Sequence, residues 1–127
     1  MSFEIEPIGY VSTEAEEVPR FYSISEVEGR LIIRDEYVEG LSDLQPGDEI
    51  LVIFYFHRSP DFGTEHLRVI PPSRGVKRGV FSTRSPVRPN PLGLSQLEVL
   101  GIEGNTVHVR GLDMVDGSPV LDIKPRK

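Results

Sequence analysis

The sequence predicts an all-β fold, a single-domain and mostly antiparallel β-barrel with short helical turns in its loops. Eleven prolines and twelve glycines interrupt the 127 residues, which disfavours long helices and suits short strands joined by turns. Short apolar stretches alternate with turn-forming pairs, a pattern typical of a compact barrel or sandwich. Residues 1–127 fit one domain that is large enough to build its own core.

We expect six to eight short strands. The best of them covers residues 50–56, which are apolar at every position and are therefore expected to be buried on both faces. In chain order, the expected elements are a first strand over 3–11 broken at Pro7, a hairpin over 21–33 turning at Glu28-Gly29, a helical turn within 37–44, a turn at Pro46-Gly47-Asp48, the strand over 50–56, strands over 67–70 and 81–83, a hairpin over 94–110 turning at Gly104-Asn105, a turn over 115–118, and a strand over 120–123.

Several functional classes are excluded or disfavoured. The chain has no cysteine, so it contains no disulfide, thiolate metal site or cysteine nucleophile, and it is compatible with a reducing cytoplasm. His57, His66 and His108 lack paired ligand spacing, so we expect no metal site. The N-terminus shows no signal peptide, and the longest apolar run is too short for a membrane helix. We therefore expect a cytoplasmic protein without membrane association.

Charge is distributed unevenly along this acidic chain of net charge −6. Residues 1–65 carry 15 acids and 4 Lys/Arg, whereas residues 66–97 carry six Lys/Arg and no acid. The six basic residues are Arg68, Arg74, Lys77, Arg78, Arg84 and Arg88. Such a block is a candidate anion-binding surface. A solvated loop is the alternative, and composition alone does not decide between the two.

The densest motif runs from Phe81 to Ser95. Three prolines within six residues restrict the backbone, so little entropy is lost when this loop binds a ligand. Arg84 and Arg88 provide forked donors for a carboxylate or phosphate, and Asn90 offers both a donor and an acceptor. The alternative is a rigid crossover with solvated arginines.

A second motif covers residues 111–125. Asp122 lies among apolar neighbours, where a carboxylate needs a partner. Arg84 or Lys124 could supply that partner. A structural ion pair is the alternative to a binding role.

The two motifs together resemble the TrmO (TsaA-like) methyltransferases. The matching patterns are F-x-T-R-S-P-x-R-P-N-P-[LI]-G-L-S and D-x-x-D-G-[ST]-P-V-L-D-I-K-P, and residues 8–11 and 54–57 are also similar to that family. The resemblance covers essentially the whole chain. It implies a homodimeric β-barrel that uses S-adenosylmethionine to methylate N6 of the threonylcarbamoyl-adenosine next to the anticodon of tRNA.

The resemblance also implies the cofactor contacts. They are Pro19, Arg20, Phe21, His57, Arg58, Arg84, Leu94, Leu121, Asp122, Ile123 and Lys124. Phe21 replaces a glutamine that family members often have, and Arg126 replaces the usual aromatic residue, so RNA recognition is the property most open to change.

For the substrate, we interpret Asn90 as the candidate catalytic acceptor that holds the N–H of the attacking amine. The candidate contacts to the tRNA anticodon loop are Arg74, Lys77, Arg78 and Arg88, with Tyr22, Tyr55 and Phe62 as possible stacking surfaces. A small-molecule methyltransferase and a non-catalytic cofactor- or RNA-binding barrel are the alternatives, and the acidic net charge favours the former.

Overall fold

The computed structural model describes residues 1–18, 25–71 and 75–127. Within them, the strands are β1 (Gly9–Ser12), β2 (Glu28–Ile33), β3 (Glu49–Tyr55), β4 (Arg68–Val69), β5 (Arg78–Gly79), β6 (Leu92–Glu103), β7 (Thr106–Arg110) and β8 (Pro119–Pro125). The short 3-10 helices are η2 (Asp35–Leu41), η3 (Thr64–Leu67) and η4 (Val80–Ser82). None of the helices in these ranges is long and apolar enough to cross a membrane.

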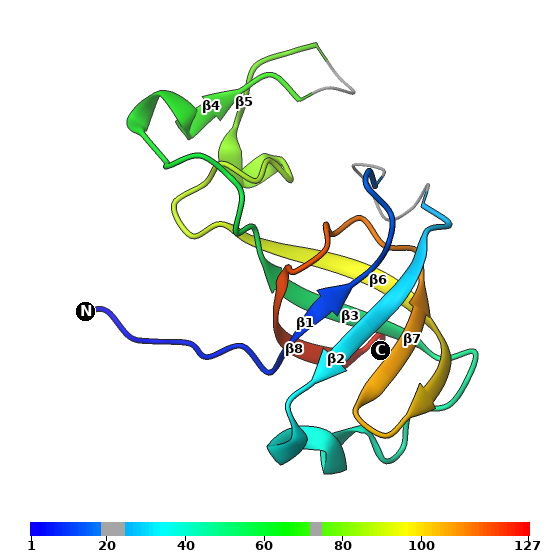
Figure 1. Cartoon of the computed structure of the whole chain (residues 1–127). Coiled ribbons are helices and arrows are strands. Elements are labelled where there is room, and N and C mark those ends of the chain that lie inside the picture. The colour runs from blue at the N-terminus through cyan, green and yellow to red at the C-terminus, as the bar shows by residue number, and fades with distance from the viewer. Residues whose placement is uncertain (19–24, 72–74) are drawn as a thin grey trace.

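Six strands form a closed barrel in the order β1-β2-β7-β6-β3-β8, and β8 pairs back with β1 (Figure 1). Every pairing in the barrel is antiparallel. The structure thus confirms the predicted antiparallel β-barrel with short helical turns. β4 and β5 form a separate two-stranded sheet outside it.

Strand β3 shows how the barrel sorts its side chains. Ile50, Val52 and Phe54 are buried in the core, whereas Leu51 and Ile53 between them are only half-buried. The prediction that this strand is buried on both faces is therefore wrong for its outer face. In a closed barrel successive side chains alternate between interior and exterior, and here the exterior is only partly covered.

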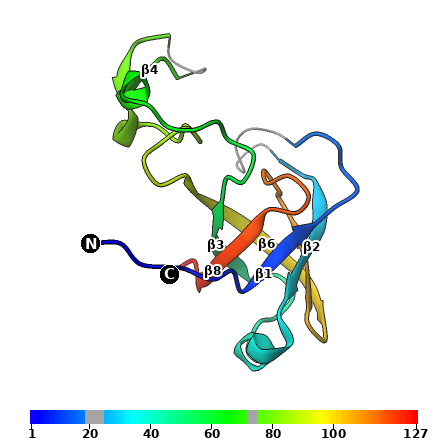
Figure 2. The ribbon, with the colours of Figure 1, turned by 60° about the vertical axis from the view of Figure 1, so that its left-hand side comes forward.

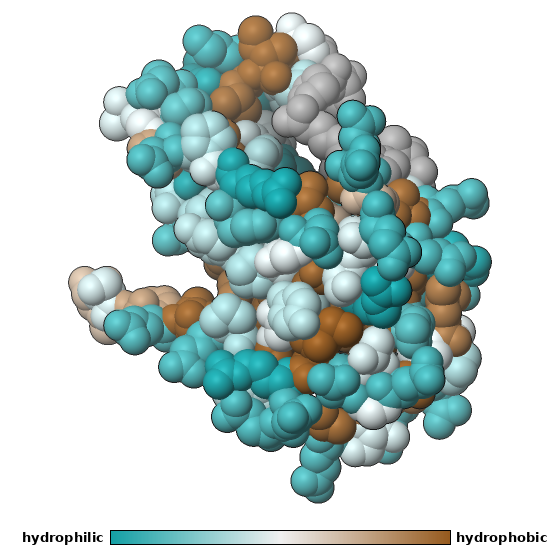
Figure 3. Space-filling model, viewed as in Figure 1, coloured by the Kyte–Doolittle hydropathy of each residue, from teal (hydrophilic) through white to brown (hydrophobic). Residues whose placement is uncertain are grey.

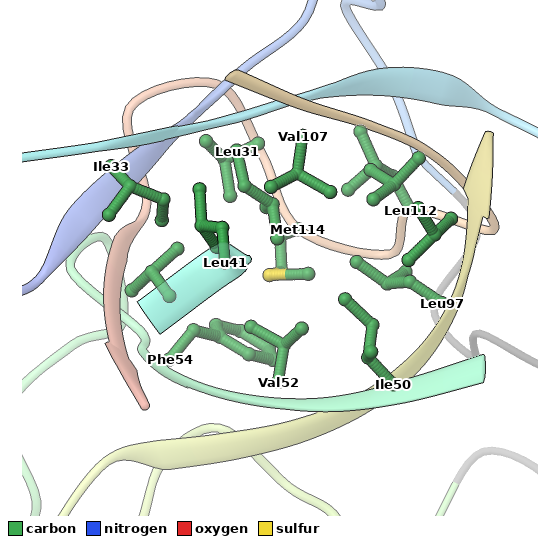
Figure 4. Packing of buried hydrophobic residues seen from close by; sticks show 14 residues of the cluster. Leu31, Ile33, Leu41, Ile50, Val52, Phe54, Leu97, Val107, Leu112 and Met114 are labelled. Atoms are coloured by element: carbon green, nitrogen blue, oxygen red, sulfur yellow. The ribbon is translucent and has the colours of Figure 1, made fainter. Parts of the chain in front are cut away.

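The core is filled partly by the loop between β7 and β8. Leu112 and Met114 are fully buried, although neither belongs to a strand. Figure 4 shows Met114 reaching into the middle of the cluster, between Val52 on β3 and Leu31 on β2. This loop is consequently anchored to the barrel at two points, and the residues around those points are held in place.

The predicted turns at 46–48, 104–105 and 115–118 are confirmed. Asp48 donates its backbone N–H to the carbonyl of Gln45 at 3.0 Å, and Ser118 donates to Val115 at 3.2 Å. Gly104 has a φ of 58°, a left-handed conformation that suits the first position of a two-residue hairpin turn.

The expected turn at Glu28-Gly29 is wrong, because both residues lie inside β2 and pair with β7. A Cβ added to Gly29 would lie 2.4 Å from Leu112 Cδ1. Glycine is thus needed here for close packing of the β7–β8 loop, and not for a turn.

Two other strands differ from expectation. The first strand begins only at Gly9; Phe3 and Ile5 are exposed, and Pro7 has no N–H to donate to a sheet. Residues 81–83 do not form a strand either, because Val80–Ser82 is a single 3-10 turn. Three residues are too few for their sequence pattern to distinguish these two states.

Residues 56–91 form a lobe between β3 and β6. The backbone N–H of Phe56 donates to the carbonyl of Pro91 at 2.8 Å, which closes the base of the lobe. Figures 1 and 2 show the lobe projecting beyond one end of the barrel, the end at which the β7–β8 loop also lies. The lobe carries η3, β4, β5 and η4.

Candidate cofactor and substrate site

A pocket of about 1010 Å³ lies between the lobe and this end of the barrel, and we call it the candidate site. Its described walls come from the lobe, from the adjoining ends of β3 and β6, from the β7–β8 loop, and from Val18 in the β1–β2 connection. Among the lining residues are Phe54, His57, Arg58, Ile70, Phe81, Thr83, Arg84, Ser85, Arg88, Leu94, Asp113 and Met114. Residues from both sequence motifs therefore meet here, as a shared binding role requires.

The charge of the candidate site is uneven. Arg58, Arg84, Arg88 and His57 line it, and Asp113 is the one carboxylate among its described lining residues. Guanidinium groups match carboxylate or phosphate, and a carboxylate matches an amine or hydroxyl donor. The arrangement suits a ligand that carries both kinds of group.

Hydroxyl side chains hold the proline motif in shape. The Thr83 hydroxyl donates to the Val80 carbonyl at 2.8 Å and accepts the N–H of Ser85 at 3.3 Å. The Ser85 hydroxyl in turn accepts the N–H of Val87 at 3.3 Å. These local bonds satisfy backbone groups that no strand partner reaches, and they fix the loop beside the pocket.

The two arginines of the motif are oriented by backbone carbonyls. Arg84 donates through Nη1 to the carbonyl of Leu94 on β6 at 3.0 Å. Arg88 donates through Nη1 to the carbonyls of Thr83 at 3.1 Å and Ser85 at 3.2 Å. Arg84 therefore links the lobe to the barrel, while Arg88 braces the loop itself.

Asp113 is a site residue that sequence reasoning missed. Its Oδ1 accepts a hydrogen bond of 2.5 Å from the hydroxyl of Ser95, which is fully buried on β6. The buried neighbours Leu112 and Met114 fix the backbone on either side. Asp113 begins the D-x-x-D-G motif. The sequence singles out Asp122 instead, because its neighbours are apolar.

His57 and Arg58 follow directly after β3. His57 donates its backbone N–H to the carbonyl of Tyr55 at 2.9 Å, and its ring lies beside Gly117 of the β7–β8 loop. Arg58 is exposed. Both line the candidate site together with Arg84 and Leu94, so the structure brings together four of the predicted cofactor residues.

The predicted group over residues 121–124 lies elsewhere and does not line the pocket. Asp122 pairs with Ile53 of β3, which in turn pairs with Leu94 of β6, so the three residues form one row on the outer face of the barrel. Asp122 forms an ion pair with Lys124 at 2.9 Å and accepts the N–H of Ile123 at 2.9 Å. Of the two partners expected for Asp122, the structure thus shows Lys124.

The remaining predicted residues are dispersed. Asn90 is exposed and does not line the pocket, and its backbone carbonyl accepts the N–H of Leu92 at 2.7 Å. Lys77 and Arg78 lie on the lobe, outside the pocket lining. Pro19, Arg20, Phe21, Tyr22 and Arg74 lie outside the described residues.

Metal binding was expected to be absent. In the ranges that the structure describes, no three His, Asp or Glu side chains converge as metal ligands would. Metal-free binding therefore stays a prediction, which calorimetry in chelator would check.

Residues 10–126 match the family described as the tRNA-methyltransferase O N-terminal domain. An S-adenosyl-L-methionine-binding protein of Archaeoglobus fulgidus is 41% identical over 123 residues, which cover 94% of this chain and 86% of that protein. A tRNA (adenine(37)-N6)-methyltransferase of Mus musculus is 44% identical over 86 residues, which cover 67% of this chain but 20% of that enzyme.

The fold is similar to that of solved relatives. The crystal structure of TrmO from Pseudomonas aeruginosa aligns with a TM-score of 0.78 and 31% identity, covering all of this chain and 55% of that one. The chain therefore spans about half the length of the solved TrmO and a fifth of the mouse enzyme.

Proposed function

Because the chain belongs to the tRNA-methyltransferase O N-terminal domain family, we propose that it binds S-adenosylmethionine and methylates N6 of the adenosine next to the anticodon of tRNA. We propose threonylcarbamoyl-adenosine as the acceptor form of that base. The observation that carries the proposal is the candidate site, where the two family-like motifs meet around one pocket. A tRNA substrate also supports the expected cytoplasmic location.

The residues that line the site fit this cofactor. Arg58 and Arg84 match its carboxylate, Asp113 matches an ammonium or hydroxyl donor, and Leu94 offers apolar surface to a ring. Small-molecule sites measure roughly 300–1,000 Å³, so a pocket of about 1010 Å³ is large enough for a ligand of this class. Bound S-adenosylmethionine supplies an already activated methyl group.

The main task of the protein is then to align the acceptor nitrogen with that methyl group. The loop Pro89-Asn90-Pro91 borders the lining residues Arg88 and Leu92, so Asn90 stands next to the site, although outside its wall. We propose that its amide oxygen accepts the N–H of the attacking amine and stabilises charge as it develops.

The group over 121–124 supports a second proposal, a homodimer. Asp122 and Lys124 lie on the outer face of the barrel, where Leu94 both lines the pocket and is exposed. Tyr55 and Leu92 expose further apolar surface near the same rows. A second chain that covers this face would bury these side chains and place residues 121–124 beside a cofactor pocket.

Substrate RNA is proposed to contact the lobe. Lys77, Arg78 and Arg88 belong to the acid-free segment 66–97, as does Arg74, which lies outside the described residues. Anticodon loops present phosphates and splayed bases, which suit a basic surface of this kind.

The experiment that tests the proposal is methyl transfer from labelled S-adenosylmethionine. We expect label in total tRNA, and after digestion in N6-methylated adenosine derivatives. Label in a pool of small metabolites, with none in tRNA, would instead support the small-molecule methyltransferase that the acidic net charge favours. Comparison of tRNA with and without the threonylcarbamoyl group identifies the acceptor form.

A further inference from the structure

The most exposed large hydrophobic side chain among the described lining residues of the candidate site is aromatic. Phe81 is 76% exposed and lines the mouth of the pocket. Its neighbour Val80 is fully buried and anchors η4, so the short turn points Phe81 outward. Phe81 is therefore held in the open by a fixed backbone.

A single exposed apolar side chain is ordinary, but a second exposed apolar side chain lines the same pocket as Phe81. Ile70, which lines the same pocket, is 62% exposed. Figure 3 shows hydrophobic surface on the lobe next to hydrophilic surface. Two exposed apolar side chains that line one pocket are typical of a binding surface.

A cation accompanies the ring. The Arg88 guanidinium carbon lies 6.0 Å from the centre of the Phe81 ring, and two backbone carbonyls already hold this guanidinium in place. Contact of this kind between a cation and a ring face is weakly favourable and orients both groups. An exposed ring beside a fixed arginine is how many proteins stack single-stranded nucleic acid.

We propose that Phe81 is the stacking platform for an unpaired nucleobase of the RNA substrate, and that Arg88 contacts the neighbouring phosphate. The inference rests on the proposed function, and it gives that function a specific base contact. The segment 66–97 around Phe81 carries six Lys/Arg and no acid, which favours the approach of phosphates. Of the stacking residues predicted from sequence, Phe62 is half-buried with its ring 6.0 Å from that of His66, and Tyr55 lies on the barrel.

The chain has no tryptophan, so one introduced tryptophan is a clean fluorescent reporter. We would compare Phe81→Trp with Phe3→Trp, because Phe3 is 75% exposed but lies in the N-terminal segment, far from the lobe (Figure 1). Titration with an anticodon stem-loop RNA should quench the Phe81→Trp variant in parallel with binding. The Phe3→Trp variant should keep its fluorescence.

Affinity gives a second readout. Phe81→Ala should weaken binding of the stem-loop roughly ten- to hundredfold, and Phe81→Tyr should retain affinity because it keeps the ring. The salt dependence of binding should be unchanged in Phe81→Ala and shallower in Arg88→Gln, because stacking releases no counterions. Affinity for S-adenosylmethionine should fall much less in Phe81→Ala than affinity for the stem-loop does.

The outcomes separate the inference from the proposed function. If the RNA binds and is methylated without quenching of Phe81→Trp, the stacking role is wrong and the function stands. If wild-type protein neither binds nor methylates tRNA, both fail. Quenching by S-adenosylmethionine alone would assign Phe81 to the cofactor. A fluorescence shift that depends on protein concentration without RNA would assign it to a contact between copies. Either result overturns the inference.

Discussion

The barrel and the lobe are stabilised by different interactions. In the barrel, six paired strands enclose a core in which residues such as Val52 and Leu97 are almost completely buried. In the lobe, the two strands have two residues each, and Leu67, Ile70 and Phe81 remain exposed. Hydrophobic burial therefore stabilises the barrel, whereas prolines and local hydrogen bonds shape the lobe. The candidate site lies between the barrel and the lobe. Substitution of ligand-contacting residues in the lobe should therefore leave the stability of the barrel largely unchanged.

The largest expected effect tests where the stability resides. Leu97→Ala removes a fully buried side chain from β6 and should lower the free energy of unfolding by about 2–5 kcal/mol. Leu67→Ala in the lobe should change it by less than about 1 kcal/mol, because Leu67 is already exposed. Urea denaturation of both variants measures the difference. Equal losses would show that the lobe shares the barrel core.

The next effect concerns the link between the two regions. Arg84→Ala should weaken binding of S-adenosylmethionine by about 1.5–3 kcal/mol, roughly ten- to hundredfold, because it removes a charge-assisted hydrogen bond. Arg78→Ala is the matched control, since Arg78 belongs to the same lobe but does not line the pocket. Calorimetry compares the two affinities. If they fall equally, Arg84 is not a cofactor residue.

A charge change in the lobe should affect RNA but not the cofactor. Neutralising Arg74, Lys77 and Arg78 together should weaken tRNA binding and reduce the slope of log affinity against log salt by roughly 0.7–0.9 for each lost phosphate contact. S-adenosylmethionine affinity should barely change. A salt titration of wild type and variant is the measurement. Unchanged affinity and slope would mean that these three side chains are merely solvated.

A smaller effect is expected from the barrel side of the site. Ser95→Ala leaves Asp113 without its buried hydroxyl donor and should cost about 1–3 kcal/mol of stability. If that bond also orients Asp113 toward the ligand, S-adenosylmethionine affinity should fall as well. Thermal unfolding with and without the cofactor separates the two contributions. Ser95→Thr, which keeps the hydroxyl, is the control for the loss of the donor.

No effect at all is expected from metal removal. S-adenosylmethionine should bind at one site per chain in the presence of a chelator, because the pocket offers arginines and one carboxylate among its described lining residues. Calorimetry in chelator tests this. Binding that returns only with added divalent ion would contradict the metal-free site.

The barrel was more predictable than the site. Local signals, such as the apolar run 50–56 and the Gly104-Asn105 turn, depend on neighbouring residues and were confirmed. A glycine in a sequence can indicate either a turn or a close packing contact. Gly29 was therefore predicted to form a turn, although it is the packing of Leu112, far along the chain, that requires its small size. The contact between Ser95 and Asp113 likewise depends on how the β7–β8 loop folds back, which no local pattern encodes.

The outer face shows a further limit of sequence reasoning. The motif residues at 121–124 are predicted to contact the cofactor, as Arg84 is, whereas strand alternation turns Asp122 to the barrel exterior, where it forms an ion pair with Lys124. The strand pairing within one chain determines which side chains lie on the same face of the barrel. Whether that face also contributes to a site depends on what covers it, and the strand register does not determine this.

The hydrogen bond from Phe56 to Pro91 has an evolutionary consequence. It joins the two chain segments where they leave neighbouring strands β3 and β6, so everything between them is an insertion in one hairpin. Lengthening such an insertion adds little entropic cost, about 0.6 kcal/mol for each doubling of its length. Changes in sequence or length within residues 56–91 can therefore accumulate at low cost, because the pairing of β3 with β6 keeps its register without them.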